Sequence, residues 1–590
     1  MLADVPTQWL LARMHARKSI VATLLLGMLV TVPALIWHRI PARDSANYAL
    51  LTDEFARGNF ARAFHPSLPP LLTTLGGALA FFLPDPFRAN QMVSILLFLL
   101  GIPGTYLLVK ELRGERVALI AAVLYAVCPY TVDLAASGGV DAGKLGLLPW
   151  LTWATLRWNR HGSMAWGMVV GGLGALLALA RGEGIFFALA AVLWHAAYLI
   201  RQRRFGPGGT WDRLAGLAGA TVTLVLILTP WLLYEHAQTG LWVTHTTQFS
   251  IYARFGIPDH WPREAIIDDN AALNPALAEP VATEPAVAGT PPAERGAPAP
   301  STPAPLLAGS AASEALHSED VDLRDIRKGI RWSKNLEKAV KGAYIPYLVL
   351  AMAGAIKRRR DEPAPPMSDY SPLILVGLNL AIFFPTNIMA PRYMSAIIPL
   401  YLHFTALGVL AVEQGLSRWR FLSTERLRYV AGAAIVILAL LSQKQLDAFM
   451  DARKHEQQTT LMHVGDWIRQ HGKAVPTYGT LPNLSVYHNG RLPILLESDG
   501  RLRYYARTDG LCLYPFYRFT PEQIAAICRQ GKVSLVFYDE KMEALCPGFS
   551  QYWPHDPAFT AVDEQPGFPH LPGKGRCRLL AFSPDRTAPR

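Results

Sequence analysis

Long apolar segments alternate with short polar ones over the first three quarters of the chain. Eleven of these segments are apolar almost throughout, and most approach the roughly 20 residues that a helix needs to cross a bilayer. They lie near residues 19–38, 88–109, 117–135, 145–158, 164–180, 184–200, 214–234, 343–356, 370–390, 393–412 and 428–443. The pattern predicts a polytopic α-helical membrane protein with about eleven spanning helices.

The apolar segment from Leu71 to Leu83 does not belong to this set. It has only thirteen residues, lies between Pro70 and Pro84, and contains Gly76 and Gly77. A helix of that length is too short to cross the hydrocarbon core, so we expect an interfacial or re-entrant helix here.

Composition and charge support a membrane protein. Hydrophobic residues make up 51% of the chain and charged residues 17%, against roughly 25% in an average soluble protein. The net charge of +11 comes from basic clusters between apolar segments, at 13–18, 110–116, 201–213, 357–360 and 418–428. Such clusters are typical of cytoplasmic loops, and they argue against nucleic acid as a partner. With the N-terminus in the cytoplasm, every cluster falls on the cytoplasmic side.

This topology places three long polar segments on the outer side of the cytoplasmic membrane, facing the periplasm or the extracellular space. They are a first outer loop at 39–87 with interfacial helices, a loop at 235–342, and the tail. Residues 272–315 are rich in Ala and Pro, a composition that predicts disorder. We therefore expect a transmembrane module over 1–445 and an extracytoplasmic domain over 446–590.

The tail is predicted to form a small α/β domain. Its pattern indicates a helix around Trp467, strands at 475–479 and 492–496, a helix that begins at Thr520-Pro521, and a strand at 533–538.

Four cysteines of the tail, Cys512, Cys528, Cys546 and Cys577, match no zinc or redox spacing. An even number in an oxidising compartment predicts two disulfides, and four buried thiols are the alternative.

One motif is misleading. Residues 138–144 match the first part of a phosphate-binding P-loop, but Leu145 follows where a Ser or Thr would hold magnesium. No strand precedes the motif, so we exclude ATP binding. The motif still contains two charged groups, Asp141 and Lys144, which the topology places at the outer membrane surface.

The first outer loop carries the clearest candidate chemistry. Asp44 follows the first apolar segment, and Tyr48, Leu51 and Phe55 are then spaced as on one face of a helix. A short amphipathic helix that starts at Asp44 or Ser45 would hold this carboxylate at the level of the lipid headgroups. The alternative is that Asp44 only caps the helix.

Several short motifs resemble those of GT-C glycosyltransferases, and most of all the protein O-mannosyltransferases and the bacterial aminoarabinose transferases that modify lipid A. They are the sequences of 43–48 (RDSANY), 58–60 (GNF), 65–71 (HPSLPPL), 177–184 (LALARGEG) and 390–400 (APRYMSAIIPL). The resemblance extends over about residues 15–445. It implies the GT-C fold and an inverting transferase that moves a sugar from a polyprenyl-phosphate carrier to a hydroxyl of a lipid, glycan or protein in the cell envelope.

The resemblance also implies that Asp44 is the general base. One carboxylate is enough, because a lipid phosphate is a good leaving group and only the acceptor proton must be removed. The adjacent pair Asp53-Glu54 is a competing candidate for the base. Asp141 is a further acidic candidate for a helper role.

The donor phosphate needs cations nearby. The resemblance points to His65, while Arg181 and Arg392 are fixed charges that can bind phosphate in a fork, and Lys144 is a further cation at the same surface. For the arginines, the alternative is that they only extend from helix ends to the membrane surface.

No ligand spacing stands out, so we expect no required metal or other cofactor. The alternative is a divalent cation held by Asp44, Asp53 and Asp141.

A transporter or flippase for a lipid-linked sugar, or a non-catalytic membrane scaffold, is the alternative function. Transporters tend to have inverted repeats and ionisable residues at mid-membrane. The chain has neither pattern, and its informative charges lie at the outer surface. The sequence therefore favours an enzyme whose partners are a lipid-linked donor, an acceptor and membrane lipids.

Overall fold

The computed structural model divides into two compact units, residues 1–266 with 327–455 and residues 267–326 with 456–590. The structure describes residues 5–38, 41, 43–65, 68–201, 207–239, 242–244, 332–361, 371–383, 390–417, 452–471, 495–497, 501–506, 510–512, 520–530, 533–562 and 578–583. Three predicted features, at 272–315, 428–443 and 475–479, lie outside these ranges.

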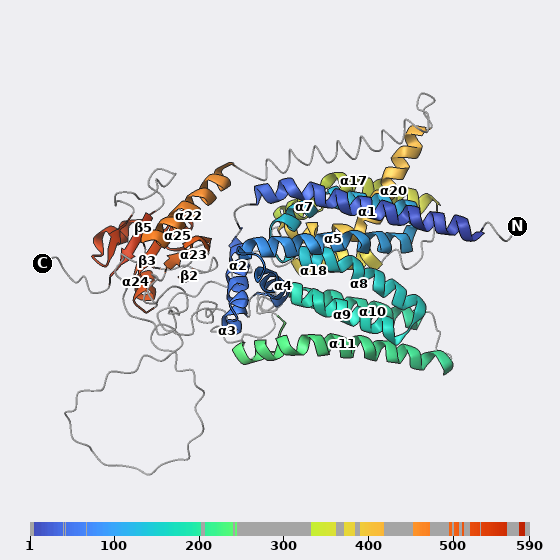
Figure 1. Ribbon diagram of the computed structural model, residues 1–590, viewed down its shortest axis with the longest axis horizontal. Coiled ribbons are helices and arrows are strands. Elements are labelled where there is room, and N and C mark those ends of the chain that lie inside the picture. Colours follow the sequence, from blue (N-terminus) through green and yellow to red (C-terminus); the bar gives the residue numbers. More distant parts are fainter. Residues whose placement is uncertain are drawn as a thin grey trace, which may run out of the picture. The chain divides into compact units, whose positions relative to one another are not determined.

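The first unit is a bundle of helices (Figure 1). Its described helices are α1 (Val5–Trp37), α2 (Arg43–Ala56), α3 (Phe60–Ala63), α4 (Pro70–Ala80), α5 (Pro86–Arg113), α6 (Glu115–Val127), α7 (Pro129–Ala136), α8 (Asp141–His161), α9 (Met164–Ala180), α10 (Gly184–Arg201), α11 (Pro207–Thr239), α16 (Trp332–Gly342), α17 (Ile345–Asp361), α18 (Ser371–Phe383), α19 (Pro391–Ser395) and α20 (Ile398–Ser417). Ten of the eleven predicted spans coincide with helices in the described part of the chain, and α4 occupies the short apolar segment.

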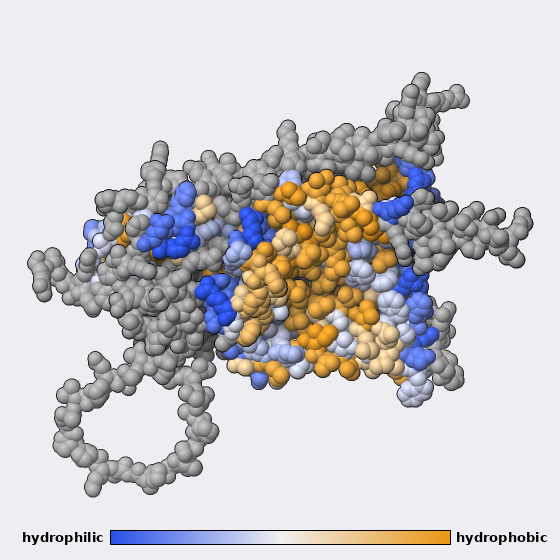
Figure 2. All heavy atoms as spheres, in the orientation of Figure 1, coloured by the Kyte–Doolittle hydropathy of each residue, from blue (hydrophilic) through white to orange (hydrophobic). Residues whose placement is uncertain are grey.

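Several of the described helices could cross a membrane. Three are long and apolar enough by composition, within α1, α5 and α11, and the bent pairs α6–α7 (53°) and α16–α17 (83°) would bring the number to five. Helices α4, α9, α10 and α18 are apolar but shorter. Figure 2 shows apolar side chains over the visible face of the bundle and hydrophilic residues at both ends of its helices. A mostly helical bundle with several candidate spans is thus confirmed, while the number eleven stays a prediction.

Small residues let neighbouring helices of the bundle approach closely. A Cβ atom at Gly167 or Gly171 of α9 would overlap a backbone carbonyl of α11, and one at Gly354 of α17 or Gly408 of α20 would overlap a carbonyl of the other helix. Such contacts are typical of membrane helices, where small residues bring backbones together and van der Waals packing replaces the hydrophobic effect.

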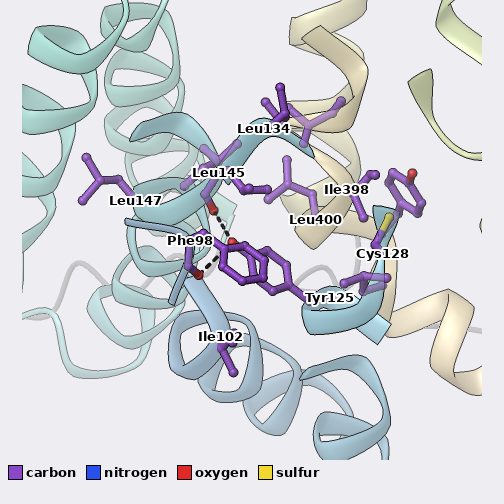
Figure 3. Close-up of a cluster of buried hydrophobic side chains, with 14 of the residues drawn as sticks. Phe98, Ile102, Tyr125, Cys128, Leu134, Leu145, Leu147, Ile398 and Leu400 are labelled. Carbon is purple, nitrogen blue, oxygen red and sulfur yellow. Dashed lines mark hydrogen bonds between the residues drawn. The ribbon is translucent and has the colours of Figure 1, made fainter. Parts of the chain in front are cut away.

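Tyr125 of α6 joins three helices in the core of the bundle. Its hydroxyl lies 3.2 Å from the carbonyl oxygen of Phe98 on α5 and 3.4 Å from that of Leu145 on α8, as Figure 3 shows. Its ring also stacks on Phe98, with ring centroids 5.3 Å apart. The buried hydroxyl therefore has acceptors, and the start of α8 is fixed against α5 and α6.

The second unit contains a mixed sheet. Its described elements are α22 (Ala452–His471), β1 (Leu495–Glu497), α23 (Arg501–Ala506), β2 (Gly510–Cys512), α24 (Pro521–Gln530), β3 (Leu535–Tyr538), α25 (Glu540–Leu545), α26 (Phe549–Tyr552), β4 (Phe559–Ala561) and β5 (Arg578–Phe582). The five described strands have the order β2-β1-β3-β5-β4; β1 is parallel to β2 and β3, and β5 is antiparallel to β3 and β4.

Alternate residues of the strands supply two apolar layers. Leu495 and Leu535 pack with α22 and α23, while Leu496 and Val536 pack with α24, α25 and α26. Helices therefore cover both faces of the sheet. The predicted helix at Pro521 and the strand within 533–538 are both present, whereas the extracytoplasmic location of this unit stays a prediction.

The prediction of two disulfides is wrong. Cys528 and Cys546 are both free and buried in the apolar layer on the α24 side of the sheet. Burial raises the pKa of the Cys546 thiol to about 12. The physical reason is that both side chains pack as small hydrophobic groups inside the core. The side chains of Cys512 and Cys577 lie outside the described residues.

Candidate functional site

An ionic cluster forms where several helices of the first unit begin or end. Among the described residues its members are three acids and three bases: Asp44, Asp141, Lys144, Arg181, Glu183 and Arg392. Asp44 lies in the first turn of α2 and Asp141 in the first turn of α8, positions at which the helix dipole favours a carboxylate. Arg181 and Glu183 lie in the turn between α9 and α10.

Acids and bases alternate through the cluster. Asp44 Oδ2 lies 2.9 Å from Arg392 Nη2, and Arg392 Nε lies 3.8 Å from Asp141 Oδ2. The other oxygen of Asp141 pairs with Arg181, whose Nε lies 2.6 Å from Glu183 Oε1. The same oxygen of Glu183 lies 3.6 Å from Lys144 Nζ. Each charge therefore faces at least one opposite charge.

Exposure falls along this series. The side chains of Asp44 and Arg392 are 48% and 45% exposed, whereas those of Asp141 and Lys144 are 8% and 1% exposed. A ligand can therefore reach Asp44 and Arg392 without any rearrangement. The buried Asp141 lies against the exposed Arg392 and so joins the two parts of the cluster.

Arg181, in the buried part of the cluster, stays protonated. Burial of Arg181 acts to lower its pKa, but the carboxylates of Asp141 and Glu183 more than offset this effect, and the pKa lies above its ordinary value. Tyr48, one turn after Asp44, behaves differently. Burial and then the Asp44 carboxylate raise the pKa of Tyr48 well above its ordinary value, so its hydroxyl remains neutral beside the charges.

Aromatic rings hold the cations in place. The Tyr393 ring lies 5.0 Å from the Arg181 guanidinium carbon and 5.4 Å from that of Arg392, so both arginines pack on one ring. Tyr393 in turn stacks on Phe383, with ring centroids 4.2 Å apart. Lys144 lies over Phe383 as well and donates to the Asn379 side chain. Cation–π contacts of this kind stabilise a guanidinium in a fixed orientation.

The turn at Gly138 sets the positions of Asp44 and Asp141 relative to each other. The Ser45 hydroxyl donates to the Ser137 carbonyl oxygen at 2.8 Å, which attaches the first turn of α2 to the segment before α8. Gly138 has φ of +63°, a backbone conformation that favours glycine. The P-loop-like sequence is therefore the turn that leads into α8.

The structure brings together five of the predicted site residues and adds others. Asp44, Asp141, Lys144, Arg181 and Arg392 all belong to the ionic cluster. Sequence reasoning missed Glu183, Tyr393 and Asn379. The first two lie inside the motifs at 177–184 and 390–400, where their charge and their ring beside an arginine were a usable signal. Asn379 was detectable only as a polar residue within an apolar helix.

The other predicted residues have described contacts elsewhere. Asp53 pairs with Arg57 at 2.9 Å, and Glu54 accepts a hydrogen bond of 2.9 Å from the Asn59 amide. Nine residues at 1.5 Å each separate Asp53 from Asp44 by about 13 Å along α2. His65 is buried, and its backbone bridges to Leu68.

Within the described ranges, no group of three or more His, Cys, Asp or Glu is arranged to hold a metal ion. Asp44 and Asp141 each face a guanidinium, which would repel a divalent cation.

The helical bundle has several candidate membrane spans, and in its ionic cluster Asp44 is the exposed carboxylate and Arg392 the exposed cation. The model of a family described as dolichyl-phosphate-mannose-protein mannosyltransferase matches residues 65–237, which include Asp141, Lys144, Arg181 and Glu183. No curated protein sequence matches the chain.

Solved structures of GT-C glycosyltransferases share the fold. The crystal structure of ArnT from Cupriavidus metallidurans bound to undecaprenyl phosphate matches with a TM-score of 0.53 and 12% identity, over 97% of this chain and 99% of that chain. The apo oligosaccharyltransferase of Archaeoglobus fulgidus matches with a TM-score of 0.52 and 15% identity, over 90% of this chain and 70% of that chain. The resemblance to this class is thereby confirmed, and at such identities the structural likeness concerns the fold alone.

Proposed function

We propose that the protein is an inverting glycosyltransferase that moves a sugar from a polyprenyl-phosphate-linked donor to a hydroxyl of a lipid, glycan or protein. The observation that carries this proposal is the pair formed by Asp44 and Arg392, 2.9 Å apart and both half-exposed at helix ends. The fold shared with ArnT, whose crystal structure contains undecaprenyl phosphate, and the match to the mannosyltransferase family model support it.

In the proposed reaction the acceptor oxygen attacks the anomeric carbon of the sugar from the face opposite the phosphate. The bond between that carbon and the phosphate oxygen breaks, and its electron pair leaves on the phosphate. Asp44 takes the proton of the acceptor hydroxyl, a contribution of about 10²–10⁴ in rate for a general base. The single attack inverts the anomeric centre.

Arg392 and Arg181 bind the phosphate in this mechanism. A guanidinium stays protonated and offers two parallel N–H groups, which fit phosphate oxygens. In the structure Arg392 is paired with Asp44. A phosphate that draws Arg392 away would release the Asp44 carboxylate for proton transfer, so donor binding and activation of the base are coupled. Lys144 is too deeply buried to reach the donor, and its role is to fix Glu183.

We further propose that the ionic cluster lies at the outer face of the cytoplasmic membrane. Lys110 and Arg113 lie in the last turn of α5, and α10 ends at Arg201, so these cations are at the ends opposite to Asp141 and Arg181 along the connected helices. Lys/Arg clusters of this kind are retained in the cytoplasm. The α/β domain at 446–590 would then lie in the periplasm or the extracellular space.

The test uses the purified protein in lipid nanodiscs with a polyprenyl-phosphate sugar that is labelled in the sugar. Incubation with a membrane extract should transfer label to one class of acceptor, which fractionation into lipid, glycan and protein identifies. Asp44→Asn should lose this transfer, while Asp133→Asn, the same change at a carboxylate that pairs with His38, should keep it. If the wild-type protein labels no fraction and instead moves the donor across vesicle membranes, the protein is a flippase and the proposal fails.

A further inference from the structure

Asp141 occupies the place between the two arginines that a phosphate would take. One of its carboxylate oxygens pairs with Arg181, and the other lies 3.8 Å from Arg392 Nε. Both guanidinium groups also pack on the Tyr393 ring, so one side chain contacts both arginines. The Asp141 carboxylate thus contacts one nitrogen of each arginine, and a phosphate oxygen would favour the same position.

The ionic cluster is formally neutral. Its three carboxylates match its three cations in number, although a site that only had to hold phosphate tightly would gain from an excess of positive charge. Asp141 is the carboxylate that touches both arginines. Glu183 pairs with Arg181, and Asp44 pairs with Arg392.

The charge of the lipid phosphate changes during the proposed reaction. The donor is a phosphodiester with a single negative charge, whereas the product is a phosphate monoester with about −1.5 to −2 charges near pH 7. Cations alone would therefore bind the product more tightly than the donor. An enzyme with such a site would be slow to release the polyprenyl phosphate.

We propose that Asp141 is an internal competitor for the phosphate, which returns to the two arginines after transfer and so favours release of the polyprenyl monophosphate product. This role rests on the proposed function and assigns Asp141 to specificity between donor and product. Its carboxylate opposes the added charge of the monoester more strongly than the single charge of the diester. It also keeps Arg181 and Arg392 paired between turnovers.

Binding measurements without any acceptor test this role. The probes are a short polyprenyl monophosphate and its methyl ester, a diester that carries one negative charge like the donor. Each probe is titrated into the wild-type protein, Asp141→Asn and Asp133→Asn in nanodiscs. Asp141→Asn should bind the monoester about tenfold or more tightly than wild type does, in line with measured couplings of close charge pairs. Its gain for the methyl ester should be clearly smaller, and Asp133→Asn should match wild type for both probes.

The outcomes separate the two proposals. If the wild-type protein binds neither probe, the proposed function fails, and the role of Asp141 fails with it. If wild type binds both probes but Asp141→Asn binds the monoester equally or more weakly, only the role of Asp141 is wrong.

If Asp141→Asn does not fold, the wild-type protein alone can still test the role of Asp141. A site that Asp141 keeps neutral should bind the monoester and the methyl ester with similar affinity, and a monoester preference of about a hundredfold, as expected of uncompensated cations, would overturn the inference.

Discussion

The two ends of α8 use the same ion-pair chemistry with opposite results. At one end, Asp141 and Lys144 join a cluster whose outermost members, Asp44 and Arg392, are half-exposed. At the other end, Arg157 and Arg160 both pair with Glu111 of α5, and here the carboxylate is buried while the arginines are partly exposed. A base must be accessible to its substrate, and of these two ends the Asp44 end is the one with an exposed carboxylate. The Glu111 end can fasten two helices together.

The largest expected effect is a difference in transfer rate between variants at the two ends of α8. Asp44→Asn should lower the rate of sugar transfer by about 10²–10⁴, because the proton of the acceptor has no base to go to. Glu111→Gln should leave the transfer rate unchanged and lower the free energy of unfolding by about 1.5–3 kcal/mol through the loss of charge-assisted hydrogen bonds. Initial rates and thermal unfolding of both variants measure these effects. Equal activity of the two variants would remove the distinction between the ends.

Helix α9 connects the two ends, since it begins near Arg160 and stops at Arg181. Gly171→Ala should lower the stability by about 1–3 kcal/mol, because the added Cβ overlaps the Ala220 carbonyl and pushes α9 away from α11. Gly377→Ala is the matched control, since a Cβ there meets nothing within 4 Å. Thermal unfolding should rank the two variants in that order. A stable Gly171→Ala protein would mean that the close α9–α11 contact does not hold the bundle.

Arg392→Lys tests the exposed cation of the Asp44 end. A lysine keeps the charge but cannot offer the parallel N–H pair, so the KM for the donor should rise about tenfold, the loss of roughly one charge-assisted hydrogen bond. Steady-state kinetics at a fixed acceptor concentration measure the change. A KM equal to that of wild type would show that Arg392 does not bind the donor phosphate.

The smallest effect concerns the buried thiols of the α/β unit. Burial raises the pKa of Cys546 to about 12, so the thiol stays protonated at pH 8 and should react with iodoacetamide far more slowly in the native protein than after unfolding. Mass spectrometry of the alkylated protein gives both rates. Fast labelling of the native protein at Cys546 would show that this core opens readily.

Much of the bundle was predictable, because a helix that faces lipid must be apolar around its circumference and therefore leaves a long signal in the sequence. The residues of the ionic cluster could be predicted only in part. Asp141, Arg181 and Arg392 were candidates because the predicted topology puts them at the same membrane surface. Their order of contact depends on how α8, α9 and α19 pack, which no local pattern reports. Glu183 was missed although its charge lies inside the motif at 177–184, because its contacts with Arg181 and Lys144 follow only from the packing.

The disulfide prediction failed for a related reason. It used the number of cysteines and the compartment, whereas the sheet packs Cys528 and Cys546 into an apolar layer as separate buried thiols.

We propose that the Asp44 end of α8 is the outer, reactive end. The most direct test of this proposal is cysteine labelling from outside intact cells, in a variant whose five native cysteines are replaced by serine or alanine. In that background, Asp44→Cys should react with a membrane-impermeant maleimide, and Arg160→Cys should react only after the membrane is permeabilised. Labelling of Arg160→Cys in intact cells, with Asp44→Cys protected until permeabilisation, would contradict the account.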